Sequence, residues 1–346
     1  MSTRTVVVGY GRSGKQFHCY LIGLTPGLIL HGVVARAAEA RQRVVNEQQC
    51  KAYASLEEAL DDADVGLIML ATPNSTHADL AVQALNAGKH VVTEKPMCVS
   101  LQDCDRMIAA AEKNGVMLNV FQNRRFDGDY LTLRKLMDDG ELGEVKWVEL
   151  AWQGFKTWGG WHGQAAWGGG RYWDLGAHLV DQLCMIFPQA VDSVYCRMHH
   201  DYAGIDVESE ALLVVTFAGG TTGVCDFSSA TAISKARFHV HGTKATFCKY
   251  GLDPQEDAMC AGDIDAAVED PSTYGILHDG RTERTVPTIP GRWRDYYENI
   301  AAVLEGEAEP VAKLAHVRRE IAVLDAGKRS AESGEVVKPD IAGLSS

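Results

Sequence analysis

Short apolar runs alternate with helical patterns over the first 121 residues of the chain. Residues 5–8, 28–35, 65–70, 90–93 and 116–121 are rich in apolar and β-branched side chains, which is typical of buried parallel strands. Residues 56–60, 78–87 and 101–114 carry apolar side chains at the spacing of amphipathic helices. Strands that alternate with helices predict an α/β fold with a doubly wound parallel sheet, the Rossmann arrangement, over residues 1–121.

The pattern changes after residue 121. Strands are expected at 146–155, 192–197, 211–217, 222–227, 236–241 and 246–250, and helices near 128–139, 174–187 and 293–305. These elements predict an α+β domain over residues 122–346, with one large, mostly antiparallel sheet whose second face is open. Residues 252–290, rich in Asp, Glu, Gly and Pro, are expected to form long loops that could cover a site.

Composition excludes several classes of protein. A net charge of -13 without any basic run argues against nucleic acid or an anionic membrane as a partner. No apolar run approaches a membrane span and the first residues do not lead into a signal peptide, so we expect a cytoplasmic protein. The nine cysteines contain no C-x-x-C pair, which indicates reduced thiols and no metal site.

A glycine-rich loop follows the first strand directly. It has the G-x-G-x-x-G pattern of dinucleotide-binding proteins, in which the glycines allow a tight turn, close approach to a pyrophosphate and packing of the next helix. The phosphates would lie at the N-terminus of that helix. We therefore expect the loop to bind a nicotinamide dinucleotide through Gly9, Tyr10, Gly11, Arg12, Ser13 and Gly14.

The end of the second strand decides how the adenosine ribose is recognised. NAD-binding domains commonly place an acidic residue there, but this chain has Arg36. A guanidinium suits a 2′-phosphate, and Arg12 and Arg41 could add to it. The preferred cofactor is therefore predicted to be NADP. Alternatively, Arg36 stacks on the adenine and NAD is accepted as well.

Two further strand ends should face the cofactor, because the carboxyl ends of parallel strands line the binding crevice. The third strand leads into Thr72, Pro73, Asn74 and His77, and the fourth into Glu94, Lys95 and Pro96. Lys95, beside Glu94, can act as a hydrogen-bond donor or proton shuttle. Pro96 restricts Lys95 to an extended conformation and allows a cis peptide bond.

The centre of the chain carries a second candidate for proton transfer. Glycines 168–170 suggest a flexible lead-in, and a helix that begins near Asp174 would place Asp174 and His178 on one face. A carboxylate that orients an imidazole can pass a proton near neutral pH. Alternatively, Asp174 is a helix N-cap and His178 lies on the helix surface.

Taken together, these motifs resemble the Gfo/Idh/MocA oxidoreductases. The resemblance rests on the glycine loop, Thr72-Pro-Asn74 with His77, Glu94-Lys-Pro96 and Asp174-x-x-x-His178, in matching order and spacing, and extends to about residue 330. Phe17-His18, residues 122–127, 241–244 and 249–256 are similar to the branch that contains scyllo-inositol dehydrogenases.

The resemblance implies further contacts. Asn123 and Arg124 would approach the nicotinamide ribose or the substrate, and Trp161 would lie nearest the nicotinamide; alternatively, Arg124 and Arg125 form an inter-domain salt bridge. The open sheet face would pair with a second subunit, giving a homodimer or homotetramer. Aromatic rings stack on sugar rings, so Trp158 and Trp167 are candidates for a lid over a sugar or polyol substrate.

These features lead to the hypothesis of reversible hydride transfer between NADP, or NAD, and a secondary hydroxyl of a sugar or cyclitol. His178 would take the hydroxyl proton, Lys95 would donate a hydrogen bond to the same oxygen, and Asp174 would orient both and the substrate. Which of Lys95 and His178 holds the proton stays open. The alternatives are a non-catalytic dinucleotide sensor and a glycosidase that cycles NAD.

Overall fold

The chain folds into two compact units in the computed structural model, which describes residues 2–341. The first unit comprises Met1–Gln122 and Trp293–Val317, and the second comprises Asn123–Arg292 and Arg318–Ser346. Residues 293–317, expected from the sequence in the second domain, belong to the first unit. The physical reason is burial: Trp293, Tyr296 and Tyr297 pack inside the first unit, where the Tyr296 hydroxyl lies 2.8 Å from Oδ1 of Asn119.

The first unit contains the predicted parallel sheet. Its six strands are ordered β3-β2-β1-β4-β5-β6 and all neighbours run parallel. The strands are β1 (Thr3–Val8), β2 (Leu28–Val34), β3 (Lys51–Tyr53), β4 (Leu67–Leu70), β5 (His90–Thr93) and β6 (Leu118–Val120). The helices are η1 (Ser13–Cys19), α1 (Tyr20–Gly23), α2 (Ala38–Gln48), α3 (Leu56–Asp61), η2 (Asn74–Thr76), α4 (His77–Asn86), α5 (Leu101–Asn114) and α9 (Arg294–Leu304).

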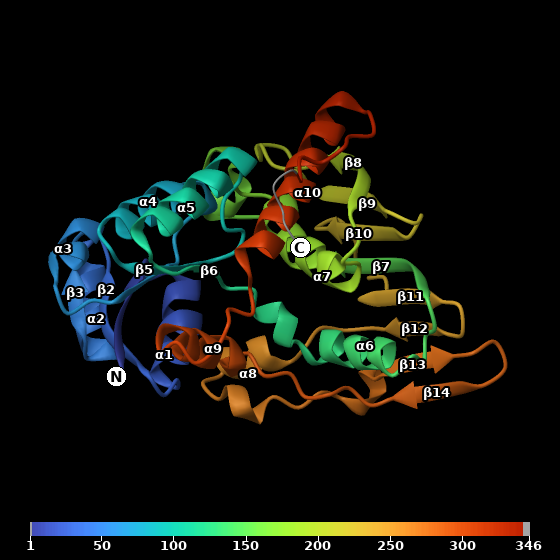
Figure 1. Cartoon of the computed structure of the whole chain (residues 1–346), viewed down its shortest axis with the longest axis horizontal. Helices are drawn as coiled ribbons and strands as arrows, with labels where there is room; N and C mark the ends of the chain where they lie inside the picture. Colours follow the sequence, from blue (N-terminus) through green and yellow to red (C-terminus); the bar gives the residue numbers. More distant parts are fainter. Residues whose placement is uncertain (1, 342–346) are drawn as a thin grey trace. The chain divides into compact units, whose positions relative to one another are not determined.

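The helices of this unit cover its sheet as expected for a doubly wound fold. α4 and α5 lie side by side, and α9 lies beside α1 (Figure 1). All four residues of β4 are buried, which explains the uninterrupted apolar run in the sequence. The strand order reverses between β1 and β4, and ligands of such sheets bind at the carboxyl ends of the strands where this reversal occurs.

The second unit contains an eight-stranded sheet ordered β14-β13-β12-β11-β7-β10-β9-β8. Among the strands that residues 2–341 contribute to this sheet, only β7 and β10 pair in parallel, so the sheet is mostly antiparallel, as predicted. The strands are β7 (Val145–Gln153), β8 (Val191–His199), β9 (Glu210–Phe217), β10 (Thr222–Ser228), β11 (Phe238–Gly242), β12 (Thr246–Lys249), β13 (Gly275–His278) and β14 (Glu283–Val286). The helices are η3 (Asn123–Phe126), α6 (Gly128–Asp138), η4 (Gly160–Gly163), η5 (Ala165–Trp167), α7 (Arg171–Ile186), α8 (Gln255–Cys260), η6 (Ile264–Ala266) and η7 (Pro271–Thr273), and α10 (Leu314–Ser333) ends in this unit.

The two faces of this sheet differ in burial. α6 and α7 lie on one face (Figure 1). On the opposite face Trp147, Leu212 and Ile276 remain 37%, 39% and 39% exposed. The predicted open face is therefore present, and it carries large apolar side chains in contact with solvent.

Residues 252–290 are more ordered than the predicted long loops. They contain α8 and the hairpin formed by β13 and β14, which extends the sheet at its edge. The hairpin was missed because each strand has four residues and most of their side chains are exposed.

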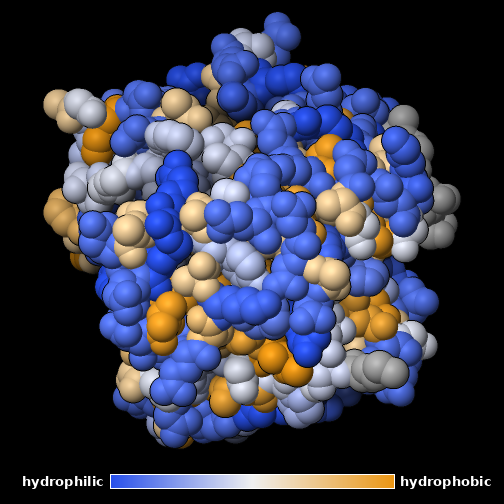
Figure 2. All heavy atoms as spheres, turned by 90° about the vertical axis from the view of Figure 1, so that its left-hand side faces the viewer, coloured by the Kyte–Doolittle hydropathy of each residue, from blue (hydrophilic) through white to orange (hydrophobic). Residues whose placement is uncertain are grey.

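No helix within residues 2–341 combines the length and apolar character that crossing a membrane requires. Figure 2 shows the face of the first unit near α2 and α3, which is mainly hydrophilic with small, separate hydrophobic patches. Scattered apolar side chains of this kind are ordinary on protein surfaces.

Candidate active site

The glycine loop has the geometry expected of a dinucleotide-binding turn. Gly9 has a φ of +104°, and a Cβ there would lie 2.3 Å from the carbonyl oxygen of Ala71 on the neighbouring strand end. A Cβ on Gly14 would lie 2.0 Å from the carbonyl oxygen of Gly9. A Cβ on Gly11 would meet no atom of the described chain within 4 Å. The fold therefore requires the first and third glycines, and close approach of a pyrophosphate explains the second.

The other loop residues have partners within the first unit. The Tyr10 hydroxyl donates to Glu47 over 2.7 Å and accepts from Gln48 over 3.0 Å. The guanidinium of Arg12 lies 5.6 Å from the ring centre of Phe17 and is exposed. Tyr10 and Arg12 both precede η1, which begins at Ser13. Both remain candidates for contact with the cofactor.

A buried hydrogen-bond network joins the loop to the end of β5. The carboxylate of Glu94 accepts from the Ser13 hydroxyl and lies 2.9 Å from Nε2 of His18. The other ring nitrogen of His18 lies 2.8 Å from the Tyr297 hydroxyl. Burial by itself would raise the pKa of Glu94, but the His18 and Ser13 contacts and the charge of Lys95 outweigh it and lower the pKa to about 2. Glu94 is thus ionised and fixed beside Lys95.

Sequence reasoning missed two members of this network. His18 was noted only as part of a similar motif, and Tyr297 was assigned to the other domain. Tyr297 contacts His18 across 279 residues of sequence, so no local pattern could have indicated the pair.

His77 connects two of the strand-end loops. Its side chain is fully buried, and its ring nitrogens each lie 2.9 Å from a carbonyl oxygen, of Thr72 and of Pro96. Burial lowers the pKa of His77, although both carbonyls and Glu94 favour the protonated ring. A neutral ring has one N–H and can donate to only one of the carbonyls at a time. His77 therefore positions the Thr72 loop against the Lys95-Pro96 turn.

The turn itself presents Lys95 at the carboxyl edge of the sheet. The Lys95–Pro96 bond is cis, the isomer that the sequence allowed, and the Lys95 N–H donates to Glu94 Oε2 over 3.0 Å. Lys95 is half-buried. In the neighbouring loop Asn74 is buried and Thr72 and Pro73 are half-buried. This loop follows β4, which pairs in parallel with β1, so all three residues lie at the same edge of the sheet as the glycines.

Two arginines predicted near the 2′-phosphate differ in their contacts: Arg36 is exposed, whereas Arg41 donates to backbone carbonyl oxygens. Arg36 is exposed immediately after β2. Arg41 donates from Nη1 to the carbonyl oxygens of Ala35 and Arg36, over 3.0 Å and 2.6 Å. Arg41 therefore shapes the turn that carries Arg36.

In the second unit, α7 carries the predicted proton-transfer pair. The helix begins at Arg171, so Asp174 lies in its first turn and is not the N-cap. Asp174 is half-buried, and His178, one turn further along the same face, is 5% exposed. The alternative of an N-cap followed by a surface histidine is therefore wrong.

The glycines before α7 are rigid packing elements and not a flexible lead-in. Gly168 and Gly170 have φ values of +67° and +99°, and all three glycines are buried. A Cβ on Gly169 would lie 2.4 Å from the His162 carbonyl oxygen, and one on Gly170 would lie 2.2 Å from Oε1 of Glu208. Absence of a side chain is needed here for close approach of other groups.

Glu208 caps α7 from a distant loop, which sequence reasoning missed. Its carboxylate accepts from the Tyr172 N–H over 2.5 Å, at the positive end of the helix dipole. Burial raises the pKa of Glu208 to about 7, although the Tyr172 N–H and Arg171 oppose the shift. The carboxylate is 36 residues from Tyr172 in sequence, and no motif marks it.

We predict that Glu208→Gln changes the pH dependence of stability. The folded pKa of about 7 exceeds the usual value of 4.5, so the folded chain retains a proton that the unfolded chain loses, and stability falls as pH rises between these values. Glutamine cannot ionise. Relative to Glu208→Gln, the wild type should lose on the order of 2 kcal/mol between pH 5 and pH 8. Thermal unfolding at both pH values measures this, with exposed Glu332→Gln as control; parallel pH profiles for wild type and Glu208→Gln would contradict it.

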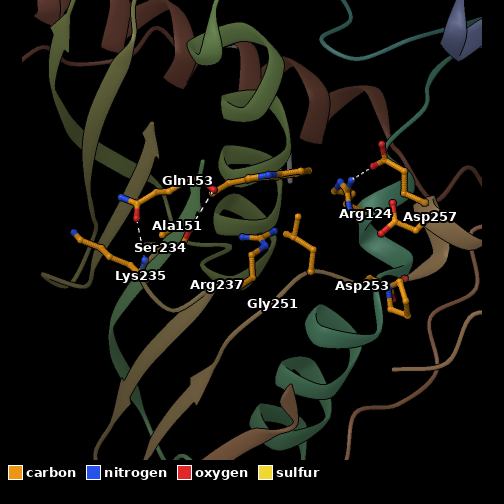
Figure 3. Close-up of a pocket in the computed structure, with 13 residues that line it drawn as sticks. Arg124, Ala151, Gln153, Ser234, Lys235, Arg237, Gly251, Asp253 and Asp257 are labelled. Atoms are coloured by element: carbon orange, nitrogen blue, oxygen red, sulfur yellow. Dashed lines mark hydrogen bonds and ion pairs between the residues drawn. The ribbon is translucent and has the colours of Figure 1, made fainter. Parts of the chain in front are cut away.

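A cavity of about 560 Å³ lies in the second unit beside Trp152 (Figure 3). The Trp152 ring stacks on His178 with ring centres 5.6 Å apart, and the guanidinium of Arg124 lies 4.2 Å from the centre of the Trp152 ring. The cavity wall thus contacts the candidate base through one tryptophan. Asn123, buried in η3, precedes Arg124.

Arg124 and Arg125 both form ion pairs within the second unit, and the alternative of an inter-domain salt bridge stays a prediction. Arg124 pairs with Asp127 at 3.1 Å and with Glu256 at 2.7 Å, and Arg125 pairs with Asp181. All these acidic residues belong to the second unit. The two arginines therefore stabilise the start of that unit from within.

The candidate tryptophans gather before α7. The ring centre of Trp158 lies 3.7 Å from the guanidinium carbon of Arg171, and Trp161 stacks on His162 with ring centres 3.9 Å apart. Trp167, in η5, is 39% exposed. An exposed and two half-buried rings in one short segment remain candidates for contact with a ligand.

One group of possible metal ligands occurs among the described residues, at His31, Asp62 and Asp64. Asp62 already accepts from Lys51 over 2.6 Å and from Tyr53 over 2.7 Å, and Asp64 pairs with Arg4 at 2.7 Å. These contacts account for the cluster as a set of ion pairs.

Comparison with known proteins agrees with both units. Residues 3–122 match the family described as "Oxidoreductase family, NAD-binding Rossmann fold", and residues 130–248 match the "GFO/IDH/MocA C-terminal domain". The uncharacterized oxidoreductase YdgJ of Escherichia coli is 31% identical, over 95% of this chain and 96% of its own length. The scyllo-inositol 2-dehydrogenase (NADP(+)) IolW of Bacillus subtilis is 30% identical, over 88% of this chain and 87% of its own length. A solved Klebsiella pneumoniae structure, described as an oxidoreductase, has a TM-score of 0.89 at 34% identity and covers 99% of this chain and 96% of that chain.

Proposed function

Because this chain belongs to the Gfo/Idh/MocA family of NAD-binding oxidoreductases, we propose that it catalyses reversible hydride transfer between NADP and a secondary hydroxyl of a sugar or cyclitol. The observation that carries the proposal is the placement of Asp174 and His178 on one face of α7, with the His178 ring against the wall of a cavity. The similarity to a scyllo-inositol dehydrogenase supports a cyclitol-like substrate.

Each candidate residue has its own role in this proposed reaction. A nicotinamide, held through the glycine loop, Thr72, Pro73, Asn74 and Trp161, would supply the hydride chemistry. His178 takes the proton from the hydroxyl, and Asp174 keeps the imidazole and the substrate oriented. Lys95, fixed by ionised Glu94, donates a hydrogen bond to the same oxygen and stabilises its developing charge.

Initial rates at the reduced-nicotinamide absorbance band, with NAD and NADP against inositols, aldoses and their keto forms, test this function. We expect turnover of at least one polyol. Cofactor binding without turnover of any polyol or ketone would overturn the proposal and favour the sensor. Release of an aglycone from a glycoside without net cofactor reduction would favour the cycling glycosidase.

The cofactor preference depends on Arg36 in this proposal. Arg36→Ala removes the guanidinium that would bind the 2′-phosphate, so KM for NADP should rise about tenfold while KM for NAD changes little. Steady-state kinetics with each cofactor measure the ratio, and Arg43→Ala, an exposed arginine on α2, is the control. An unchanged ratio would instead support stacking of Arg36 on the adenine.

We also propose that the open sheet face, with exposed Trp147, Leu212 and Ile276, contacts a second copy of the chain in a homodimer or homotetramer. Sedimentation equilibrium measures the assembly, and a monomer at micromolar concentration would exclude it.

A further inference from the structure

The cavity beside Trp152 contains a buried arginine with incomplete hydrogen bonding. Arg237 lines the cavity and is 2% exposed. Its Nη2 donates to Gln182, but Nε and Nη1 have no hydrogen-bond partner among the described residues. The carboxylate of Asp129 is 3.8 Å from Nε, beyond hydrogen-bond distance. Burying guanidinium N–H groups unpaired is unfavourable, so an acceptor from outside the chain would stabilise them.

The other cations at the cavity already have partners. Arg124 contacts Asp127 and Glu256, and Lys235 contacts Glu149 and Asp226 at 2.7 Å each. Figure 3 shows Arg237 between Lys235 on one side and Arg124 on the other. Arg237 is therefore the cation of this wall whose N–H groups are available to a ligand.

The charge around the cavity disfavours an anion. Arg124 and Lys235 are each contacted by two carboxylates, and Asp253 and Asp257 add two further ones to the wall. Burial raises the pKa of Asp129, which weakens it as a counter-ion, yet the remaining carboxylates still outnumber the cations. A carboxylate or phosphate on the ligand would meet this excess of negative charge.

We propose that Arg237 is a specificity-determining residue that donates from Nη1 to a hydroxyl oxygen of a neutral polyol, and that the cavity rejects polyols bearing a carboxylate or phosphate. The volume of about 560 Å³ lies within the usual range for small-molecule sites. The Trp152 ring, which stacks on His178, connects this wall to the candidate base. The assignment of the ligand as substrate rests on the proposed function, whereas the binding preference does not.

Calorimetry on the full chain with saturating NADPH tests the preference, because the reduced cofactor cannot oxidise a polyol and the heat then reports binding alone. The probes are scyllo-inositol and D-glucose as neutral polyols, and D-glucuronate and D-glucose 6-phosphate as anionic counterparts. In the wild type the neutral probes should bind at least tenfold more tightly than the anionic ones. Arg237→Gln should weaken neutral binding at least tenfold, whereas Arg281→Gln, an exposed arginine of the same unit, should leave it unchanged.

Equal or tighter binding of the anionic probes, no binding of any probe, or unchanged neutral binding by folded Arg237→Gln would overturn the proposal. Circular dichroism and NADP affinity report folding; if Arg237→Gln does not fold, the wild-type ranking of the probes decides. Neutral probes that bind with the predicted dependence on Arg237 but are not turned over would refute the dehydrogenase function and leave the preference intact. Turnover of a neutral probe with an unchanged KM in Arg237→Gln would refute the proposed role of Arg237 and leave the dehydrogenase function intact.

Discussion

Asparagine in place of His178 is expected to lower kcat by about 10²- to 10⁴-fold, with the affinity for NADP retained. Asparagine keeps a polar side chain of similar size but cannot accept the hydroxyl proton. The imidazole is 5% exposed and lies against Trp152, so its orientation is fixed before substrate arrives. Steady-state kinetics measure the loss, and fluorescence titration with reduced cofactor measures the affinity.

His200→Asn is the matched control, since His200 is an exposed histidine of the same unit. It should retain wild-type kcat. If His178→Asn also retains it, His178 is not the base and Lys95 becomes the remaining candidate.

Methionine in place of Lys95 is expected to lower kcat by about 10²- to 10³-fold, the effect of removing one donor from a developing oxyanion. Methionine preserves much of the aliphatic length and removes the charge. Glu94 remains bonded to Ser13 and His18, so the glycine loop and cofactor affinity should persist. The same kinetic and titration measurements apply.

Lys113→Met, on the exposed side of α5, is the control for removal of a charge from this unit. A Lys95→Met enzyme that loses cofactor affinity but keeps kcat would show that Lys95 binds the cofactor and does not act on the substrate.

Local patterns were sufficient for much of the first unit. The apolar runs of β4 and β5 are buried, and α4 and α5 have regularly spaced apolar side chains, so position in sequence predicted position in this part of the unit. Gly9 and Gly14 were predictable because their spacing reflects a backbone requirement, which the structure confirms. The family match confirms the resemblance that these motifs indicated.

Long-range contacts were not predictable in this way. Tyr297 reaches His18, Glu208 caps α7, and Arg237 borders the cavity, each through packing of segments far apart in sequence. The glycines before α7 were misread as flexible because the sequence does not reveal which atoms approach them. The short, exposed strands of the β13–β14 hairpin lack the apolar alternation on which strand prediction depends.

Transfer of deuterium from substrate to cofactor tests the central claim most directly. A polyol that the enzyme oxidises would be labelled with deuterium at the reacting carbon and incubated with NADP, and the reduced cofactor analysed by mass spectrometry. We expect one deuterium per reduced cofactor, because the hydride moves directly from carbon without exchange with water. Reduced cofactor without deuterium, or ketone formed without reduced cofactor, would contradict it.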